Sequence, residues 1–311
     1  EESAEDARPA SEGHRPDPTL DEVTEAVRQR YDKSVSLTDL KWSSYFRISH
    51  RIVPRYRVGR AMLAGDAAHI HPPTGGQGMN TGIQDAYNLA WKLGLVLRGL
   101  ARPELLDSYN DERLPIGRQI VEQTTQRSMS LHESGQDDAS RADSQLFLDY
   151  ADAGWVSGSL PEGASAPRPG ERASDVQGLT RSGLGFPLRL FELLRGTAHV
   201  LLYYDAPERA DSRKKFEAAA AALARGSQGA VRGYIVRPPA AGADLLSSLP
   251  VVDDAAGNFA RLYAPTPGSL LAVRPDGYVG YRDAGFHAAG LLAYLERIFQ
   301  PEVLAELRSL A

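Results

Sequence analysis

The sequence predicts an α/β protein of roughly two domains. Segments with the apolar spacing of helices alternate with short apolar runs typical of strands, above all in the C-terminal half. The chain has 311 residues, 42% of them hydrophobic, which is enough for two hydrophobic cores. A glycine-rich loop also lies between a short strand and a long helix, an arrangement typical of ligand-binding α/β proteins.

Composition and charge exclude several classes of protein. The net charge is -5, so no nucleic-acid partner is expected. Cysteine is absent, which excludes disulfides, thiolate metal sites and cysteine nucleophiles, and suits a reducing cytoplasm. The apolar stretches are shorter than the ~18 residues of a membrane span, and the first residues do not resemble a signal peptide. We therefore expect a cytoplasmic protein without a membrane partner.

The N-terminal part is expected to hold a flexible tail, a helix and a strand. Residues 1–18 are acidic and rich in Pro, Ser and Gly, as in a mobile tail. Thr19 and Glu22 have the spacing of a capping box at the start of a helix. Period-two alternation over residues 40–48 predicts a strand. Its aromatic side chains either pack in the core or line a substrate cavity: Trp42, Tyr45 and Phe46.

A short strand and a long helix flank the glycine-rich loop. Residues 61–64 predict a buried strand that ends at Gly65-Asp66. A helix begins near Asn80 and ends before Gly99, which is expected to cap it. The spacing of its apolar residues predicts the face that packs on the core: Ile83, Ala86, Tyr87, Ala90, Leu93 and Leu97. A further helix near residues 105–109 is expected to be renewed at Pro115.

The C-terminal part is expected to alternate between strands and helices after two irregular stretches. Residues 133–144 predict a loop, and residues 155–175, rich in Pro and Gly, predict a linker. Strands are expected at residues 199–204, 233–237, 270–273 and 278–281. The last two flank Pro275-Asp276-Gly277, a strong hairpin turn. Helices are expected at residues 213–225 and 287–299.

The candidate binding site runs from Gly65 to Asn80. A carboxylate at the end of a strand, as at Asp66, points into the crevice where α/β proteins bind ligands and accepts hydrogen bonds from sugar hydroxyls. The glycines let the backbone approach a ligand closely: Gly75, Gly76 and Gly78. The amides at the helix start favour an anion: Gly78, Met79 and Asn80. The alternatives are a carboxylate that only caps a turn and a loop that is only a tight turn.

Two histidines close to Asp66 raise the question of a metal site. His69 and His71 are two residues apart, a spacing that suits ligands on a strand. No further cluster of ligand residues follows them in the sequence. We therefore expect no metal, and interpret His69 as packing or hydrogen bonding within the turn.

The passage resembles the second FAD-binding motif of class A flavoprotein monooxygenases, the para-hydroxybenzoate hydroxylase-like aromatic hydroxylases. The resemblance rests on Gly-Asp-Ala-Ala-His-x-x-Pro-Pro-Thr-Gly-Gly-x-Gly-Met-Asn-x-Gly-x-x-Asp-Ala, which begins at Gly65. Three further passages are similar to the same family: the strand from Trp42 to Ile48, Tyr56-Arg57-x-Gly59-Arg60 and Tyr109-x-x-Glu112-Arg113-x-Pro115. The match is dense from about Lys41 to Val121, and the strings are far more specific than an isolated GxGxxG.

This resemblance implies FAD as the cofactor and assigns roles around it. Asp66, after Gly65, would bind the ribityl chain, and the amides near Ala67 the pyrophosphate. A second segment would lie beside the isoalloxazine ring, with Pro72 and Pro73 helping to exclude water at the reaction site: Pro72, Pro73 and Thr74. Gly75 and Gly76 would continue the loop, and a third group would meet the pyrimidine edge of the ring: Gly78, Met79 and Asn80.

The resemblance also implies a reaction. NADPH or NADH would reduce FAD, which forms a C4a-hydroperoxide with O2 and hydroxylates an aromatic substrate. The substrate class stays open among phenols, hydroxyphenyl acids, polyketides and rifamycin-like antibiotics. A homodimer is compatible with the family.

The C-terminal part is similar to the thioredoxin-like domain of phenol hydroxylase-type and polyketide hydroxylases. The similarity rests on Pro169-Gly170-x-Arg172-Ala173 and on the run from Leu271 to Val279. Without cysteine this domain cannot carry out dithiol chemistry, so a structural or dimer-contact role is expected. The organisation expected is a tail at 1–18, a remnant of the substrate domain at 19–60, the C-terminal part of an incomplete Rossmann-like FAD-binding domain at 61–132, a loop and linker at 133–168, and the thioredoxin-like domain at 169–311.

The sequence lacks the GxGxxG turn that opens a complete FAD-binding fold. Three interpretations are open: a C-terminal fragment, a partner N-terminal half on another polypeptide, or a chain that has lost catalysis. We favour the fragment and expect that the isolated chain does not retain FAD and is inactive. The alternative function is a non-catalytic thioredoxin-like interaction module with a vestigial flavin segment.

Overall fold

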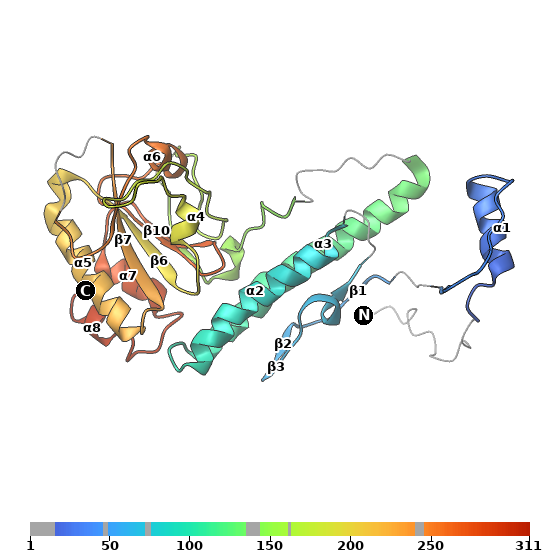
Figure 1. Cartoon of the computed structure of the whole chain (residues 1–311). Coiled ribbons are helices and arrows are strands. Elements are labelled where there is room, and N and C mark those ends of the chain that lie inside the picture. The colour runs from blue at the N-terminus through green and yellow to red at the C-terminus, as the bar shows by residue number, and fades with distance from the viewer. Residues whose placement is uncertain (1–15, 46–48, 72–75, 135–143, 161–162, 240–245) are drawn as a thin grey trace. The chain divides into compact units, whose positions relative to one another are not determined.

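The computed structural model describes residues 16–45, 49–71, 76–134, 144–160, 163–239 and 246–311, with the backbone alone described for 127–134 (Figure 1). These residues form two compact units, Glu1–Ser49 and His50–Ala311, each of which is described by itself. The α/β class predicted from the sequence is confirmed, because the structure contains helices together with parallel and antiparallel strand pairs. The domain boundaries proposed from the sequence stay a prediction.

The first unit contains one helix, α1 (Leu20–Arg30). Its capping box is confirmed, since the Glu22 amide donates to Thr19 Oγ1 at 3.3 Å and the Thr19 amide donates to Glu22 Oε2 at 2.8 Å. The predicted strand is wrong for residues 40–45, which are irregular; residues 46–48 lie outside the described part. A strand needs a paired neighbour, and the described residues of this unit offer none. Trp42 is accordingly 81% exposed, so it lines no cavity there.

The second unit begins with two small antiparallel sheets. In one, β1 (Arg51–Ile52) pairs with β4 (His69–Ile70), and in the other β2 (Arg57–Val58) pairs with β3 (Ala61–Met62). The strand predicted at 61–64 is therefore shorter than expected, and it is not buried, because Ala61 and Leu63 are exposed. The 3-10 turn η1 (Gly65–Ala67) lies between β3 and β4 and carries the first predicted site residues.

Two long helices follow and lie side by side (Figure 1). Helix α2 spans Gly78–Leu97, and Gly99 after it has φ +70°, which confirms the predicted glycine cap. A short 3-10 turn, η3 (Pro103–Leu106), leads into α3 (Asp107–Ser134). The predicted renewal at Pro115 is wrong, because α3 continues through that residue without a break. In the part of the chain that is described, no helix is long and apolar enough to cross a membrane.

Helix α2 buries a different face from the one its apolar residues predict. Ile83 is 59% exposed, Tyr87 54% and Leu97 77%. The buried face instead carries polar and charged side chains as well as apolar ones: Thr81, Asp85, Asn88, Trp91, Lys92 and Leu95. The prediction fails because the buried polar groups find ionic and hydrogen-bonding partners on other elements, which hydropathy alone does not reveal.

The C-terminal part is built on a six-stranded sheet of order β5-β10-β9-β6-β7-β8. The neighbours β6 (His199–Tyr204) and β7 (Val231–Arg237) are parallel, whereas β9 (Leu270–Val273) runs antiparallel to both β6 and β10 (Val279–Asp283). This arrangement of β10, β9, β6 and β7 is that of a thioredoxin-like core. The edges are β8 (Val251–Asp253) and β5 (Ser157–Gly158), the latter within the stretch predicted as a linker.

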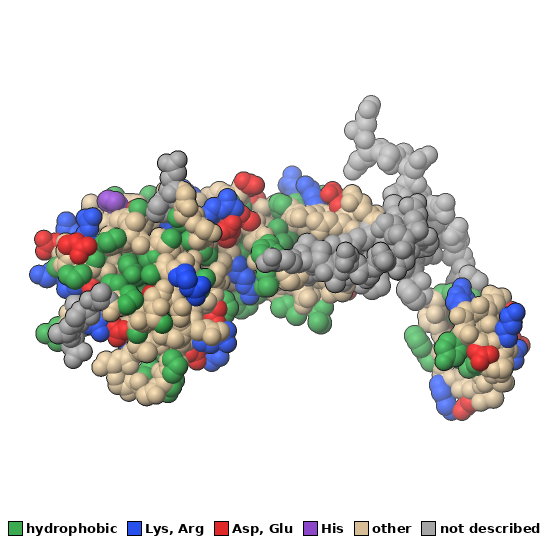
Figure 2. Space-filling model, turned by 90° about the horizontal axis from the view of Figure 1, so that it is seen from above, with side chains coloured by type: hydrophobic (Ala, Val, Ile, Leu, Met, Phe, Trp, Pro, Cys, Tyr) green, Lys and Arg blue, Asp and Glu red, His purple; other side chains and the backbone are tan. Residues whose placement is uncertain are grey.

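Helices cover both faces of this sheet (Figure 1). They are α4 (Leu190–Leu193), α5 (Ala210–Gly226), preceded by η6 (Pro207–Arg209), α6 (Asn258–Tyr263), α7 (Ala288–Leu295) and α8 (Ala305–Arg308), and η5 (Ala151–Ala153) lies before β5. The helix predicted at 213–225 and the hairpin at 270–281 are confirmed. Acidic and basic side chains are intermingled over the face of this part seen in Figure 2.

One hydrophobic core joins the long helices to the thioredoxin-like sheet. Trp91, Leu95 and Leu105 pack in the same cluster as sheet and helix residues such as Leu201 and Phe299. A second core lies on the opposite side of the sheet, around Val200, Val273 and Tyr263. The α2–α3 pair and the sheet therefore share their interior.

His199, at the start of β6, makes this shared core sensitive to acid. It is 1% exposed, touches the rings of Trp91 and Phe299, and neither ring nitrogen has a hydrogen-bond partner. Burial, with the nearby charge of Arg274, lowers the pKa of His199 from 6.5 to about 3. Because the folded pKa is below the unfolded one, stability is fully present above pH 6.5 and falls as the pH drops from 6.5 towards 3.

We predict that His199→Leu removes this acid sensitivity. Between pH 6.5 and 4 the wild-type protein should lose about 1.4 kcal/mol per pH unit through His199, and the variant should not. Urea unfolding at pH 7.5 and pH 5 measures the difference, with Phe299→Leu as a control that trims the same core without removing a titrating group. Equal pH dependence in wild type and His199→Leu would contradict the prediction.

Candidate flavin-binding site

The turn Gly65–Ala67 packs directly on helix α2. Gly65 has φ +58°, a left-handed conformation that favours glycine. Its Cα lies so close to the helix that a Cβ added at Gly82 would be 3.2 Å from it. The Gly65 amide donates a hydrogen bond to Asp85 Oδ2 at 3.1 Å. The two glycines thus allow the close approach, and Asp85 fixes the turn in place.

Asp85 is a fully buried carboxylate that connects three elements. It accepts hydrogen bonds from His69 Nε2 at 2.8 Å and from Arg113 Nε at 2.7 Å, besides that from Gly65. Burial would raise the pKa of Asp85, but the hydrogen bond from His69 and the charge of Arg113 lower it. The ionised carboxylate therefore holds the turn, β4 and α3 together from its place on α2.

The N-terminus of α2 presents unpaired backbone amides. The Gln77 carbonyl accepts from the Thr81 amide at 3.0 Å. Among the described residues, the amides of Gly78, Met79 and Asn80 have no acceptor, as is usual in the first turn of a helix. That turn contains no acidic side chain, so the positive end of the helix dipole is not compensated there.

Gly76, a described residue of the loop just before the helix, has φ +62°. No heavy atom of the described residues lies within 4 Å of a Cβ placed there. The exposed start of α2 is therefore a candidate place for an anionic or polar ligand edge.

The structure brings part of the predicted site together. The turn with Asp66 and Ala67, both exposed, contacts α2 within one turn of Asn80, through Gly65 and Gly82. Gly76 and Met79 are also exposed. The four remaining predicted residues lie outside the described part of the chain: Pro72, Pro73, Thr74 and Gly75.

The histidines of the site pair with protein groups. His69 is bonded to Asp85 as described, and its ring stacks against that of His71 with centroids 6.2 Å apart. Within the described residues no group of three or more His, Asp or Glu side chains is placed to hold a metal ion.

A buried charge cluster lies next along the same two helices. It consists of Lys92 on α2, Glu112 on α3, and Arg274 and Asp276 from the β9–β10 turn, none of them more than 9% exposed. Arg274 donates to both oxygens of Glu112, at 2.6 and 2.8 Å, and to Asp276 Oδ2 at 2.6 Å. Lys92 Nζ donates to Glu112 Oε2 at 2.7 Å. The two cations and two anions balance.

The cluster is held in ionised form by its own charges. Burial raises the pKa of Glu112, but the charges of Arg274 and Lys92 bring it down to about 2. Burial lowers the pKa of Lys92 to about 8 against the opposing effect of Glu112. Near neutral pH Glu112 and Lys92 are therefore both charged, and each depends on its partners for its place in the interior.

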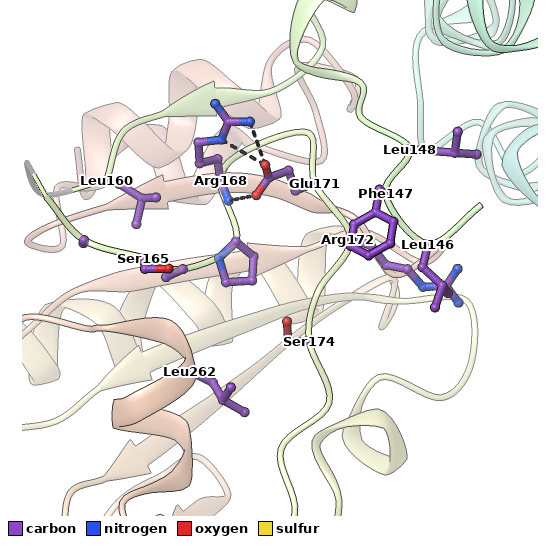
Figure 3. Close-up of a pocket in the computed structure, with 13 residues that line it drawn as sticks. Leu146, Phe147, Leu148, Leu160, Ser165, Arg168, Glu171, Arg172, Ser174 and Leu262 are labelled. Carbon is purple, nitrogen blue, oxygen red and sulfur yellow. Dashed lines mark hydrogen bonds and ion pairs between the residues drawn. The ribbon is translucent and has the colours of Figure 1, made fainter. Parts of the chain in front are cut away.

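An open pocket of about 600 Å³ lies apart from these residues (Figure 3). Two of its charged groups pair with each other, because Arg168 lies 2.7 Å from Glu171; Arg168 also lies 3.5 Å from Asp149. Figure 3 shows the Phe147 ring beside Arg172 on one side of it and Leu262 on the other. No predicted flavin contact lines this pocket, so it is not part of the candidate site.

The residues that hold the site together were not predicted from the sequence. Asp85, Glu112 and Arg113 stand in the strings that carried the family resemblance, yet no role was derived for them. The available signal was the spacing of Asp85, Asn88 and Lys92, which places polar groups three, four and seven residues apart on one helix face. That pattern is also typical of a solvated face, so spacing alone did not distinguish the two.

The fold and the site define an α/β protein in which the turn Gly65–Ala67, packed on a long helix, is joined to a sheet of thioredoxin-like topology. Residues 5–124 match the family described as FAD binding domain. The chain is 34% identical over 285 residues to a flavin-dependent monooxygenase of Mycobacteroides abscessus, covering 90% of this chain and 49% of that protein. It is 32% identical over 297 residues to pentachlorophenol 4-monooxygenase of Sphingobium chlorophenolicum, covering 88% of this chain and 52% of that protein.

Solved structures of flavin-dependent enzymes are also similar to this chain. A ternary complex of aklavinone-11 hydroxylase with FAD and aklavinone superposes with a TM-score of 0.68 at 28% identity, covering 96% of this chain and 53% of the hydroxylase. The flavin-dependent monooxygenase PieE, solved with FAD and substrate, gives a TM-score of 0.66 at 25% identity, covering 96% of this chain and 56% of PieE.

These comparisons confirm the resemblance to class A FAD-dependent aromatic monooxygenases and, with it, FAD as the cofactor of the group. The chain spans about half the length of the curated relatives it matches.

Proposed function

We propose that this chain provides the flavin-ring side of the active site of an FAD-dependent monooxygenase that hydroxylates an aromatic substrate of the phenol or polyketide kind, with NADPH or NADH and O2 as co-substrates. The observation that carries the proposal is the start of α2, where amides with no acceptor among the described residues lie beside a turn that Asp85 fixes. Two of the named proteins act on or bind such compounds, pentachlorophenol in one case and aklavinone in the other.

The chemistry divides between the cofactor and the chain. When bound, FAD supplies electron transfer from the nicotinamide and activation of O2. The exposed Asp66 carboxylate would accept hydrogen bonds from the ribityl hydroxyls, and the amides near Ala67 would hold the pyrophosphate. The amides at the start of α2 would stabilise negative charge on the pyrimidine edge of the ring: Gly78, Met79 and Asn80. By the resemblance, Pro72, Pro73 and Thr74 would lie beside the ring, with Pro72 and Pro73 helping to exclude water.

The exposed apolar face of α2 belongs to the same proposal. Ile83 and Tyr87 stand on the side of the helix that faces away from its buried polar residues. Exposed apolar stripes of this kind mark surfaces that another part of a protein covers. We propose that the remainder of a complete FAD-binding fold packs there, in the same polypeptide or a separate one.

The role of Asp66 can be tested in the complete FAD-loaded enzyme, that is, this chain together with the remainder of the FAD-binding fold. Asp66→Asn should weaken FAD binding about tenfold, because a carboxylate accepts hydrogen bonds from hydroxyls about twice as strongly as an amide. The free energy of unfolding should stay within about 0.5 kcal/mol of wild type, since the side chain is exposed. Flavin fluorescence titration measures the affinity, and Asp111→Asn on α3 serves as an exposed control. Equal FAD affinity in Asp66→Asn and wild type would refute the assigned role.

Oxidation of the nicotinamide distinguishes the enzyme from a non-catalytic interaction module. If the protein is a monooxygenase, the rate of NADPH or NADH oxidation rises when a phenolic or polyketide substrate is added. The hydroxylated product is then detected by mass spectrometry. The interaction module would instead be supported if the protein folds and binds partners without flavin. Asp66→Asn would then leave partner binding unchanged.

A further inference from the structure

The β9–β10 turn of the thioredoxin-like part inserts charged side chains between α2 and α3. Arg274 binds Glu112 on α3 through two hydrogen bonds, and Asp276 Oδ2 accepts from Trp91 Nε1 on α2 at 3.0 Å. The backbone of the same turn takes part, because the Pro275 carbonyl accepts from Tyr87 Oη at 3.1 Å. This one turn therefore contacts both helices at the same position along their length.

These contacts lie next to those that hold the turn Gly65–Ala67 in place. Glu112 is followed directly by Arg113, whose Nε donates to Asp85, and Asn88 lies one helical turn after Asp85. Asn88 Nδ2 donates to Glu112 Oε2 at 2.7 Å. The contacts of Glu112 and those of Asp85 are therefore linked by a hydrogen bond between the helices as well as by the backbone of each helix. A continuous series of buried contacts thus runs from Arg274 through Glu112, Arg113 and Asp85 to the Gly65 amide.

A second series of contacts reaches the same guanidinium from the sheet. Arg113 NH1 donates to Tyr150 Oη at 3.1 Å. The Tyr150 ring packs on Tyr278, with centroids 4.3 Å apart, and Arg274 lies 5.4 Å above the Tyr150 ring. Arg113 therefore rests on the thioredoxin-like part on one side and on Asp85 on the other.

We propose that Arg274 is a positioning residue for the flavin site: by fixing Glu112 against α2, it sets the place of Arg113 and Asp85 and hence of the turn that carries Asp66. This gives the cysteine-free thioredoxin-like domain a function in the proposed reaction, as the support of the flavin-binding helices. The inference rests on the proposed function, because it concerns the same turn.

The test separates positioning from folding by keeping the buried charges balanced. Arg274→Met combined with Asp276→Asn removes one cation and one anion and leaves the Lys92–Glu112 pair intact. Arg274→Lys, made in parallel, keeps the charge but cannot reproduce the two-pronged contact with Glu112. The control is Arg213→Met, another arginine of the thioredoxin-like domain paired with a buried carboxylate, Asp205, at 3.2 Å. Each variant is prepared in the FAD-loaded enzyme.

The readouts are the FAD dissociation constant and the visible circular dichroism of the bound flavin, with far-ultraviolet dichroism reporting the fold. We expect the double variant to fold, to bind FAD about tenfold more weakly, which is within the range typical of coupling between sites, and to alter the flavin dichroism. Arg274→Lys should fall between the double variant and wild type, and Arg213→Met should match wild type.

Folded Arg274 variants with the FAD affinity and flavin dichroism of wild type would overturn the inference. So would an equal loss of affinity in Arg213→Met, because that would show a general effect of destabilising the domain. If the double variant does not fold, the comparison of Arg274→Lys with Arg213→Met decides in the same way. Failure of the proposed function itself looks different, because then the complete wild-type enzyme, with the remainder of the FAD-binding fold present, binds no FAD.

Discussion

Replacing Asp85 by asparagine is expected to destabilise the protein by about 3–5 kcal/mol, the typical cost of leaving a buried charge without its partner. Arg113 is fully buried, and Asp85 is the carboxylate that pairs with its guanidinium. An asparagine at this position also presents an NH2 group where the native carboxylate accepts from the Gly65 amide, His69 and Arg113. The loss therefore affects the turn of the candidate site as well as the contact between helices.

Urea unfolding at pH 7 measures this effect, with Asp66→Asn as the matched control for an exposed carboxylate in the same site. The pH dependence has a defined sign. Because the folded pKa of Asp85 is lowered, its contribution is present above the unfolded pKa and is lost as the pH falls through the folded one. The gap between Asp85→Asn and wild type should therefore narrow in acid. A loss below about 1 kcal/mol at pH 7 would contradict the role given to Asp85.

Elements whose signals are local were predictable from the sequence. The capping box at Thr19, the glycine after α2 and the Pro-Asp-Gly turn each need information from a few neighbouring residues, and the structure confirms all three. The strand at residues 40–45 failed because period-two alternation describes a face and does not supply a partner strand. Pro115 failed for the opposite reason, since the packing of α3 outweighs the local preference of proline to begin a helix.

The candidate site likewise contains some residues that could be predicted from the sequence and others that could not. Asp66 and the glycines follow one another in the sequence, so their chemistry could be inferred before the fold was known. Asp85 and Arg113 are 28 residues apart, and Glu112 and Arg274 are 162 residues apart. Nothing in one sequence shows that such charges meet in the interior. The face of α2 that looked polar is the buried one because those distant partners compensate its charges.

The other large effect is expected at Glu112. Glu112→Gln leaves Lys92 and Arg274 with Asp276 as the remaining anion of the cluster, an excess of one positive charge in a fully buried place. We expect a loss of about 3–5 kcal/mol in the free energy of unfolding. Since the folded pKa of Glu112 is lowered to about 2, its contribution is present above its ordinary value of 4.5 and lost as the pH falls from there towards 2.

Restoring the charge balance should recover part of this loss. Lys92→Met alone removes a cation whose pKa burial has already lowered to about 8, so it should cost less than Glu112→Gln. In the double variant Arg274 and Asp276 remain as a balanced pair, and its loss should be smaller than the sum of the single losses by about 1–3 kcal/mol. Urea unfolding of the four proteins at pH 7 gives this coupling energy, and additivity within about 0.5 kcal/mol would show that the charges do not act together. A large coupling would show that Lys92 on α2 and Glu112 on α3 stabilise the protein as a pair, through their direct contact at 2.7 Å.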